Sequence, residues 1–292
     1  MMEASAFRSG KTHRDENFPV ARLVRARHRE PILAFYDFVR TADDIADHPQ
    51  LAPADKLRGL DALENSLTGG DDAQTAGVRL RRALDQRGLA DRHARDLLRA
   101  FRQDVTKSRY ADWEELVHYC ALSAMPVGRF VLDVHGEAET TWAASDPLCA
   151  ALQIINHLQD CGKDYRSLDR VYLPLDALAR TGAGVADLGA AKASPPLRAC
   201  LAELAGKTRV LVDQGARLPA LVADTRLSLE CSVIHALAAK LTAVLERRDP
   251  LSERVHFGRL GSLGVALAGA ASGAFARVGR LGLMTKLGKE GA

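Results

Sequence analysis

The chain has 292 residues, of which 47% are hydrophobic, and its 40 basic and 37 acidic side chains leave a net charge of +3. This length is enough for one large domain with a sizeable core, and the near balance of charge excludes a general nucleic-acid-binding surface. Five cysteines without a C-x-x-C spacing argue against a disulfide framework or a zinc site, and a polar N-terminus lacks a signal-peptide core, so a cytoplasmic protein is expected.

Apolar residues recur with a helical period along the chain, whereas alternating strand patterns are scarce. The expected helices cover residues 19–29, 31–47, 53–67, 73–87, 90–105, 112–135, 145–163, 174–180, 194–216 and 218–248, with a further short turn at 185–188. Pro31 should begin the second of these helices, where its missing N–H costs nothing, and His48-Pro49 should end it. The pattern predicts an all-α protein without a domain linker.

The helix expected over 112–135 carries its own boundary signals. Asp112 is a plausible N-cap with Glu115 three residues later, which together form a capping box. Gly136 is a natural stop, and Pro126 should kink the helix in between. The small residues on this helix either leave room for a long apolar chain or allow close helix packing; they are Ala121, Ser123, Ala124 and Gly128.

A first polar stripe lies on the helix expected over 31–47. At about 100° per residue, Tyr36, Arg40, Asp43 and Asp47 fall within one narrow sector. The remaining faces are apolar, so the helix is largely buried and its acidic face needs partners. Asp44 lies off the stripe and could cap, bind a metal through water or pair with a cation. Taken alone, the stripe could equally be a salt-bridge network anchored by Arg40.

A second polar stripe lies on the helix expected over 145–163 and at its end. Its members are Gln153, Asn156, Asp160 and Asp164, with His157 at the border. The neutral side chains add oxygens and N–H donors beside the two carboxylates. Gly162 in mid-helix costs about 1 kcal/mol relative to Ala, which predicts the close approach of another group. His157 is interpreted as a core histidine with satisfied hydrogen bonds.

Two buried pairs of aspartates in one helical protein predict a shared cation. Carboxylates on separate helices, completed by water, suit Mg²⁺ that holds a diphosphate. Mg²⁺ and Arg would stabilise the charge that builds on a departing diphosphate, and aromatic faces would stabilise the carbocation left behind. The aromatic candidates for lining are Phe18, Phe35, Tyr36, Phe38, Phe130, Tyr165 and Tyr172.

These motifs resemble those of the squalene/phytoene synthase family, the head-to-head synthases of isoprenoid diphosphates, from about Glu16 to Asp249. The first family motif is matched by Asp43-Asp44-Ile45-Ala46-Asp47, preceded by Tyr36 and Arg40, and the second by Gln153, Asn156, Asp160 and Asp164. The segment "RVYLPLDAL" that follows carries over Arg170 and Tyr172. The resemblance implies an isoprenoid-synthase helical bundle around a central cavity, with a catalytic domain over residues 1–250 and a tail over 251–292.

The resemblance also implies roles for individual residues. Asp43, Asp47, Asp160 and Asp164 would bind Mg²⁺ with Asn156 beside them, and these aspartates and Tyr172 would form the catalytic set. Arg40 and Arg170 would contact the diphosphate, and Asn17 and Tyr36 would hydrogen-bond to it. Phe18 and Gln153 complete the expected substrate-binding set. Lys163 stands where many relatives carry Glu, which leaves the number of metal ions open.

Three further segments resemble the bacterial hydroxysqualene synthase branch of the family: "ENFPVA" (16–21), "FRQDVTKSRYADW" (101–113) and "SAMPVGR" (123–129). This branch implies Mg²⁺-dependent ionisation of presqualene diphosphate and capture of the cation by water, without NADPH, in hopanoid precursor synthesis. One alternative is the condensation of two farnesyl diphosphates to presqualene diphosphate or squalene. A second alternative is a non-catalytic, isoprenoid-binding helical protein.

The C-terminal residues 258–289 are rich in Gly and Ala and are basic, with no charge from Leu260 to Ala276. This stretch is only weakly apolar for a membrane span, which needs about 20 strongly apolar residues. It predicts either an interfacial helix that makes peripheral contact with the inner face of the cell membrane, or a terminal segment docked on the core.

Overall fold

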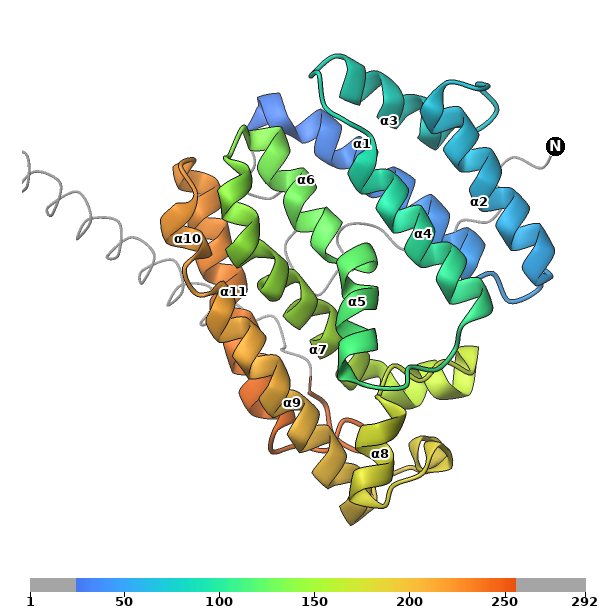
Figure 1. The fold of residues 1–292 in the computed structure, drawn as a ribbon, viewed down its shortest axis with the longest axis vertical. Coiled ribbons are helices and arrows are strands. Elements are labelled where there is room, and N and C mark those ends of the chain that lie inside the picture. Colours follow the sequence, from blue (N-terminus) through green and yellow to red (C-terminus); the bar gives the residue numbers. More distant parts are fainter. Residues whose placement is uncertain (1–24, 256–292) are drawn as a thin grey trace, which may run out of the picture.

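The computed structural model describes residues 25–255, and these form a bundle of helices (Figure 1). The elements are α1 (Ala26–Ala46), α2 (Pro53–Thr68), α3 (Thr75–Asp85), α4 (Arg92–Thr106), α5 (Trp113–Ser123), α6 (Met125–His135), η2 (Glu139–Thr141), α7 (Trp142–Leu168), α8 (Leu175–Thr181), η3 (Val185–Gly189), α9 (Pro195–Gly215), α10 (Leu218–Leu221) and α11 (Thr225–Leu245). Within the described range, β-structure is limited to an isolated bridge between Arg109 and Val171. The predicted all-α class is confirmed.

The helices form two groups, each with its own hydrophobic core. Helices α1 to α4 bury one cluster together with Phe130 and Val134 of α6. Helices α5, α7, α8, α9 and α11 contribute to the second cluster. Figure 1 shows α5 and α6 between the two groups, with α1 to α4 on one side and α9 to α11 on the other. The polar stripes of α1 and α7 therefore belong to different groups.

Helix α1 runs without interruption through Pro31, so the prediction that this proline begins a helix was wrong. Proline cannot donate the helical hydrogen bond to the carbonyl of residue 27. The Arg87 guanidinium donates to the Arg27 carbonyl instead, at 2.7 Å. A donor from another part of the chain thus satisfies the group that the proline leaves open. Residues 25–29 join α1, and residues 19–24 lie outside the described range.

The helix predicted over 112–135 is two helices, α5 and α6, divided at Ala124 just before Pro126. Asp112 caps α5 as predicted, because its carboxylate accepts from the Glu115 backbone N–H at 2.8 Å. Gly136 ends α6 with a φ of 74°, in the left-handed region. The sequence correctly placed a distortion of the helix near Pro126. The structure shows a break between two helices there, where only a kink was expected.

The helix predicted over 218–248 is likewise divided, into α10 and α11. Asp224 breaks the run and caps α11, since its carboxylate accepts from the backbone N–H groups of Arg226 and Leu227 at 2.9 and 3.1 Å. Helix α11 is long and apolar enough to cross a membrane by length and composition, but half of its most apolar window is buried inside the structure. Its packing against α7 and α9 accounts for that apolarity.

Helix α7 extends beyond its predicted limits and ends at Asp169, whose φ is 50°. The chain that follows pairs with the α4–α5 connection. Val171 N–H donates to the Ser108 carbonyl, and Leu175 N–H donates to the Tyr110 carbonyl, both at 2.9 Å. This pairing fixes the backbone between residues 170 and 175, which carries two of the predicted site residues.

Candidate active site

The first wall of the site is the polar face of α1. The Arg40 guanidinium lies 2.8 Å from the Asp43 carboxylate and 3.0 Å from that of Asp44. Asp44 therefore pairs with a cation, one of the alternatives that the sequence left open. Tyr36 and Asp47 are half-buried on the same helix. The wall presents one guanidinium to several carboxylates, so it carries excess negative charge.

The second wall is the polar face of α7, where Gln153, Asn156, Asp160 and Asp164 are all half-buried. Lys163 is exposed. Gly162 lies where the chain comes close: a Cβ there would lie 2.5 Å from Leu251 Cδ2. The predicted close approach at this glycine is confirmed, and the approaching groups belong to the protein itself.

The two walls meet through Arg170. Its Nη1 lies 2.6 Å from Oδ1 of Asp47, although the two residues are 123 positions apart in the sequence. The pKa of Asp164 is raised to about 7, mainly by burial, and the negative charges of Asp160 and Asp47 contribute to this rise. Asp164 on α7 thus interacts with Asp47 on α1, and the structure brings the two predicted aspartate pairs to one place.

The carboxylate of Asp43 is partly exposed but has protein atoms on several sides. Its side chain is 34% exposed, yet loss of solvation is the main cause that raises its pKa to about 6, followed by the charge of Asp47. We call the site formed by Asp43, Asp47, Asp160, Asp164 and Arg170 the aspartate recess.

A further carboxylate, Asp104 of α4, borders this recess and was missed by the sequence analysis. It accepts hydrogen bonds from the Tyr119 hydroxyl at 2.8 Å and the Tyr172 hydroxyl at 3.4 Å. Burial raises its pKa to about 7, and the charges of Asp47 and Asp43 contribute. Asp104 has no second acidic residue four positions away on its polar helix, so no paired spacing marked it. The available signals were its place three residues after Phe101 and its position within the segment 101–113 that resembles the hydroxysqualene synthase branch.

The ring of His157 stacks on that of Tyr172 with centroids 3.6 Å apart and planes inclined by 15°. Its Nε2 is buried and has no hydrogen-bond partner among residues 25–255. Burial, and then the charge of Arg170, lower the pKa of His157 to about 3, so the imidazole is neutral. The prediction of a core histidine is confirmed for its burial, but the prediction of satisfied hydrogen bonds is wrong at Nε2.

A sequence model of the family described as squalene/phytoene synthase matches residues 11–260 of the chain. The chain belongs to the squalene/phytoene synthase family. It is 62% identical over 257 residues to a hydroxysqualene synthase of Rhodopseudomonas palustris, with 88% of each chain covered. It is 56% identical over 261 residues to a hydroxysqualene synthase of Sinorhizobium fredii, with 89% of each covered. The predicted resemblance is confirmed.

Solved structures of the family have the same arrangement. The squalene synthase HpnC of Alicyclobacillus acidocaldarius aligns with a TM-score of 0.72 at 29% identity, covering 84% of this chain and 92% of that one. A dehydrosqualene synthase in complex with a ligand aligns with a TM-score of 0.74 at 19% identity, covering 86% and 88%. These structures establish the isoprenoid-synthase fold, and the family match with the curated relatives establishes that the chain is an enzyme of the family.

The family's acidic residues form a donor set that suits a hard cation. Within residues 25–255, no three His, Cys, Asp or Glu side chains converge closely enough to form a metal site unaided. The carboxylates of Asp43 and Asp164 nevertheless have pKa values raised by burial and by the charge of neighbouring aspartates, with Asp47 acting on both, and a cation between the walls would relieve this repulsion. Carboxylate oxygens completed by phosphate and water are the ligands that Mg²⁺ prefers.

The predicted aromatic lining is only partly present. Phe35, Phe38 and Phe130 belong to the first core cluster, and Phe35 stacks on Phe130 at 3.9 Å. Gly128 would place a Cβ 2.5 Å from Cys149 Sγ, so it serves close packing of α6 on α7. Asn17, Phe18 and residues 258–289 lie outside the described range.

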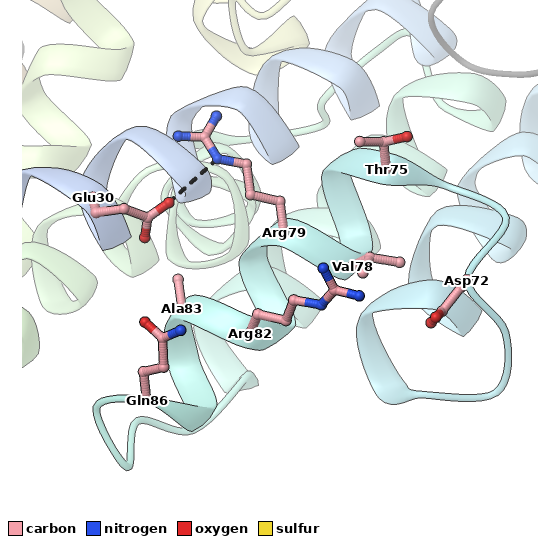
Figure 2. A pocket seen from close by; sticks show the side chains of 8 residues that line it. All are labelled: Glu30, Asp72, Thr75, Val78, Arg79, Arg82, Ala83 and Gln86. Carbon is pink, nitrogen blue, oxygen red and sulfur yellow. Dashed lines mark hydrogen bonds and ion pairs between the residues drawn. The ribbon is translucent and has the colours of Figure 1, made fainter.

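A groove of about 560 Å³ lies elsewhere, on the surface between α1 and α3 (Figure 2). Arg79 of α3 spans it toward Glu30 of α1, with Nε 3.3 Å from Oε1. Glu30 is about 140° around α1 from Asp43 by helical geometry. None of the predicted site residues lines this groove, so it is separate from the aspartate recess.

Proposed function

We propose that this enzyme ionises presqualene diphosphate in a Mg²⁺-dependent reaction and that water captures the rearranged cation to give hydroxysqualene. The meeting of two carboxylate walls across the Arg170–Asp47 ion pair is the observation that carries this proposal. Two relatives that are identical to this chain at more than half of the aligned residues are named hydroxysqualene synthases, which favours this member of the family's reactions.

Different residues of the recess would bind the metal ion and the diphosphate. Asp43 and Asp47 from α1, and Asp160 and Asp164 from α7 with Asn156 beside them, would hold Mg²⁺, which stabilises negative charge on the departing diphosphate. Arg40 and Arg170 would bind phosphate oxygens through charge-assisted hydrogen bonds. Tyr36 on the same face as Arg40, together with Asn17, would add neutral hydrogen bonds.

The aromatic side of the recess would then hold the hydrocarbon part. Tyr172 presents a buried ring next to Arg170, and a ring face stabilises a cation within about 6 Å. Asp104 holds the hydroxyls of Tyr119 and Tyr172, so it fixes the orientation of these rings. The product forms when water supplies the oxygen and no hydride is consumed, so NADPH is not required.

Incubation of the purified chain with presqualene diphosphate and Mg²⁺ tests the proposal. We expect release of diphosphate and formation of hydroxysqualene, measured by phosphate assay and by mass spectrometry of the lipid extract, without an effect of NADPH. Squalene or presqualene diphosphate formed from farnesyl diphosphate would instead assign the condensation reaction. Binding of either diphosphate without any turnover would assign a non-catalytic isoprenoid-binding protein.

We also propose a cytoplasmic location with peripheral membrane contact through the basic C-terminal segment, because the substrate is a lipid. Sedimentation with anionic liposomes should decrease when residues 258–289 are removed, and unchanged sedimentation would exclude this contact.

A further inference from the structure

The C-terminal end of α1 carries Asp43, Asp44 and Asp47, and its last turn contains no basic residue. This end of a helix has a partial negative charge, because its last carbonyl groups lack helical donors. Carboxylates are unfavourable there, so the turn needs hydrogen-bond donors and positive charge from outside it. Arg40 pairs with Asp43 and Asp44 from one turn earlier, and Arg170 pairs with Asp47.

Lys56 of α2 supplies a further donor to this turn. Its Nζ donates to the carbonyl oxygen of Ala46 at 2.8 Å. Ala46 is the last residue of α1, so its carbonyl has no partner within the helix. The positive charge of the ammonium group also suits the negative end of the helix. Lys56 therefore satisfies a group that α1 itself leaves open.

This hydrogen bond acts on the peptide unit that leads into Asp47. The carbonyl of Ala46 and the N–H of Asp47 belong to the same planar group. The N–H donates to the Asp43 carbonyl at 2.9 Å, and the carbonyl accepts from Lys56. The unit is thus held on both sides, and Lys56 helps to fix the backbone from which the Asp47 side chain starts.

Asp47 depends on this support because it lies just outside the helix. It is the C-cap residue, with φ of −92° and ψ of 1°, so no further helical turn holds it. Its side chain is 36% exposed, and the contact with Arg170 orients its carboxylate. In the proposed function, Arg170 also binds phosphate oxygens and is then shared with the ligand. The peptide unit held by Lys56 keeps Asp47 in place in that state.

Helix α2 lies close enough to α1 to provide a firm support. A Cβ at Gly59, three residues after Lys56, would lie 3.0 Å from Cγ2 of Ile45. The glycine therefore allows the backbone of α2 to approach the same turn of α1 that carries Ala46. Lys56 reaches the Ala46 carbonyl from a helix that is packed against this turn.

We propose that Lys56 is a positioning residue for metal binding, which holds the peptide unit between Ala46 and Asp47 and so keeps the Asp47 carboxylate where it can bind Mg²⁺ beside the diphosphate. This inference rests on the proposed function. Loss of a positive charge alone would strengthen the binding of a nearby cation, whereas loss of position would weaken it. The direction of the change therefore separates positioning from a simple effect of charge.

The experiment compares the full-length wild type with Lys56→Met and Lys56→Arg, using Mg²⁺ and inorganic pyrophosphate. In Lys56→Met, we expect the Mg²⁺ concentration for half-maximal binding, measured by calorimetry, to rise about tenfold, as is usual when a group that orients a metal ligand is lost. The affinity for pyrophosphate at saturating Mg²⁺ should stay close to that of wild type. Lys56→Arg should restore most of the Mg²⁺ affinity, because a guanidinium can donate to the same carbonyl.

Arg58→Met is the matched control, since it removes a positive charge two residues away on the same helix. The Arg58 side chain is 72% exposed and pairs with Asp55 of α2, so the Mg²⁺ requirement should not rise. An unchanged or lower Mg²⁺ requirement in Lys56→Met would overturn the inference. Weaker pyrophosphate binding at saturating Mg²⁺ would also overturn it, because Lys56 would then act on the diphosphate directly.

Urea unfolding without ligands measures the structural effect of each variant. Met keeps the apolar part of the side chain, and Lys56→Gln takes its place, with the same expected direction, if the Met variant does not fold. Equal loss of Mg²⁺ affinity in Lys56→Arg and Lys56→Met would indicate a general disturbance of α2 and would overturn the inference. Absence of alcohol from the wild-type reaction, with Mg²⁺ binding intact, would instead overturn the proposed reaction alone.

Discussion

At the scale of single residues, the chain buries more negative charge than its own cations offset. Asp43, Asp104 and Asp164 all have pKa values raised by burial. Such carboxylates oppose folding at neutral pH, since the unfolded chain solvates their charge better. A protein that keeps them in spite of this cost uses the charge for binding.

Replacement of Asp43 by Asn should therefore separate activity from stability. We expect turnover to fall by about 100-fold or more, because one oxygen of the cation site is lost, while the free energy of unfolding stays equal or increases. Steady-state kinetics and urea unfolding measure the two effects. The control Asp37→Asn changes a carboxylate on another face of α1, 3.7 Å from Arg79. Unchanged turnover in Asp43→Asn would remove this aspartate from the site.

Glu230 of α11 lies outside the recess and should make the free energy of unfolding depend on pH. The residue is 7% exposed, and burial raises the pKa of its carboxyl from 4.5 to about 7. Because the folded-state pKa exceeds the unfolded one, its charge destabilises the fold as pH rises through this interval. Glu230→Gln should raise the free energy of unfolding by up to about 3 kcal/mol at pH 8. Urea titrations should show the gain vanish near pH 4.5, and a gain independent of pH would contradict this account.

The residues that sequence reasoning found and missed differ in a physical way. The aspartates of α1 and α7 can be recognised in the sequence because two carboxylates four residues apart on an apolar helix are improbable by chance. Neither Asp104 nor Glu230 has another acidic residue three or four positions away on its helix, so no spacing marks them. The unpaired Nε2 of His157 depends on neighbours that three other parts of the chain supply. Such a property can be read only from the folded structure.

At the scale of elements, helix interiors were predicted more reliably than helix ends. The break at Pro126 and the caps at Asp112 and Gly136 follow from local chemistry. The prediction that Pro31 begins a helix was wrong because α1 continues through the proline with the help of a distant donor. That donor, Arg87, is about 60 residues away in the sequence. Residues near in sequence thus determine where a helix tends to form, and distant ones decide where it ends.

Gly162 and Gly206 form a matched pair of helical glycines. A Cβ at Gly162 would lie 2.5 Å from Leu251 Cδ2 and 3.2 Å from the Leu188 carbonyl, whereas nothing lies within 4 Å of one at Gly206. Gly206→Ala should stabilise the protein by about 0.5–1 kcal/mol through helix propensity. Gly162→Ala should destabilise it by about 1–3 kcal/mol through overpacking. Equal effects in thermal unfolding would contradict the close approach at Gly162.

At the scale of the whole molecule, the site lies where the two core clusters meet. Aspartates from α1 belong to one group of helices and those from α7 to the other, and Arg170–Asp47 joins them. A ligand that binds both walls should therefore stabilise the entire fold. The fold class and the joining of the two stripes could be predicted from sequence, because apolar periodicity requires buried faces and buried acids require a shared partner.

Mg²⁺ together with inorganic pyrophosphate should raise the unfolding temperature by about 4 °C at 100 times the dissociation constant. Either component alone should have a smaller effect, because neither spans both walls. Differential scanning fluorimetry measures the shift, and Asp164→Asn should abolish most of it. A full shift in that variant, or an equal shift with Mg²⁺ alone, would show that the ligand does not bridge α1 and α7.

The backbone pairing between residues 108–111 and 171–176 has a consequence for how the enzyme can vary. Arg170 and Tyr172 take their positions from the α4–α5 connection, to which Arg109 adds an ion pair with Asp169 at 2.5 Å. Groups outside the proposed site thus set the positions of two residues that we propose to bind the substrate. Substitutions in the α4–α5 connection can therefore shift the positions of Arg170 and Tyr172, although no residue of the aspartate recess itself changes.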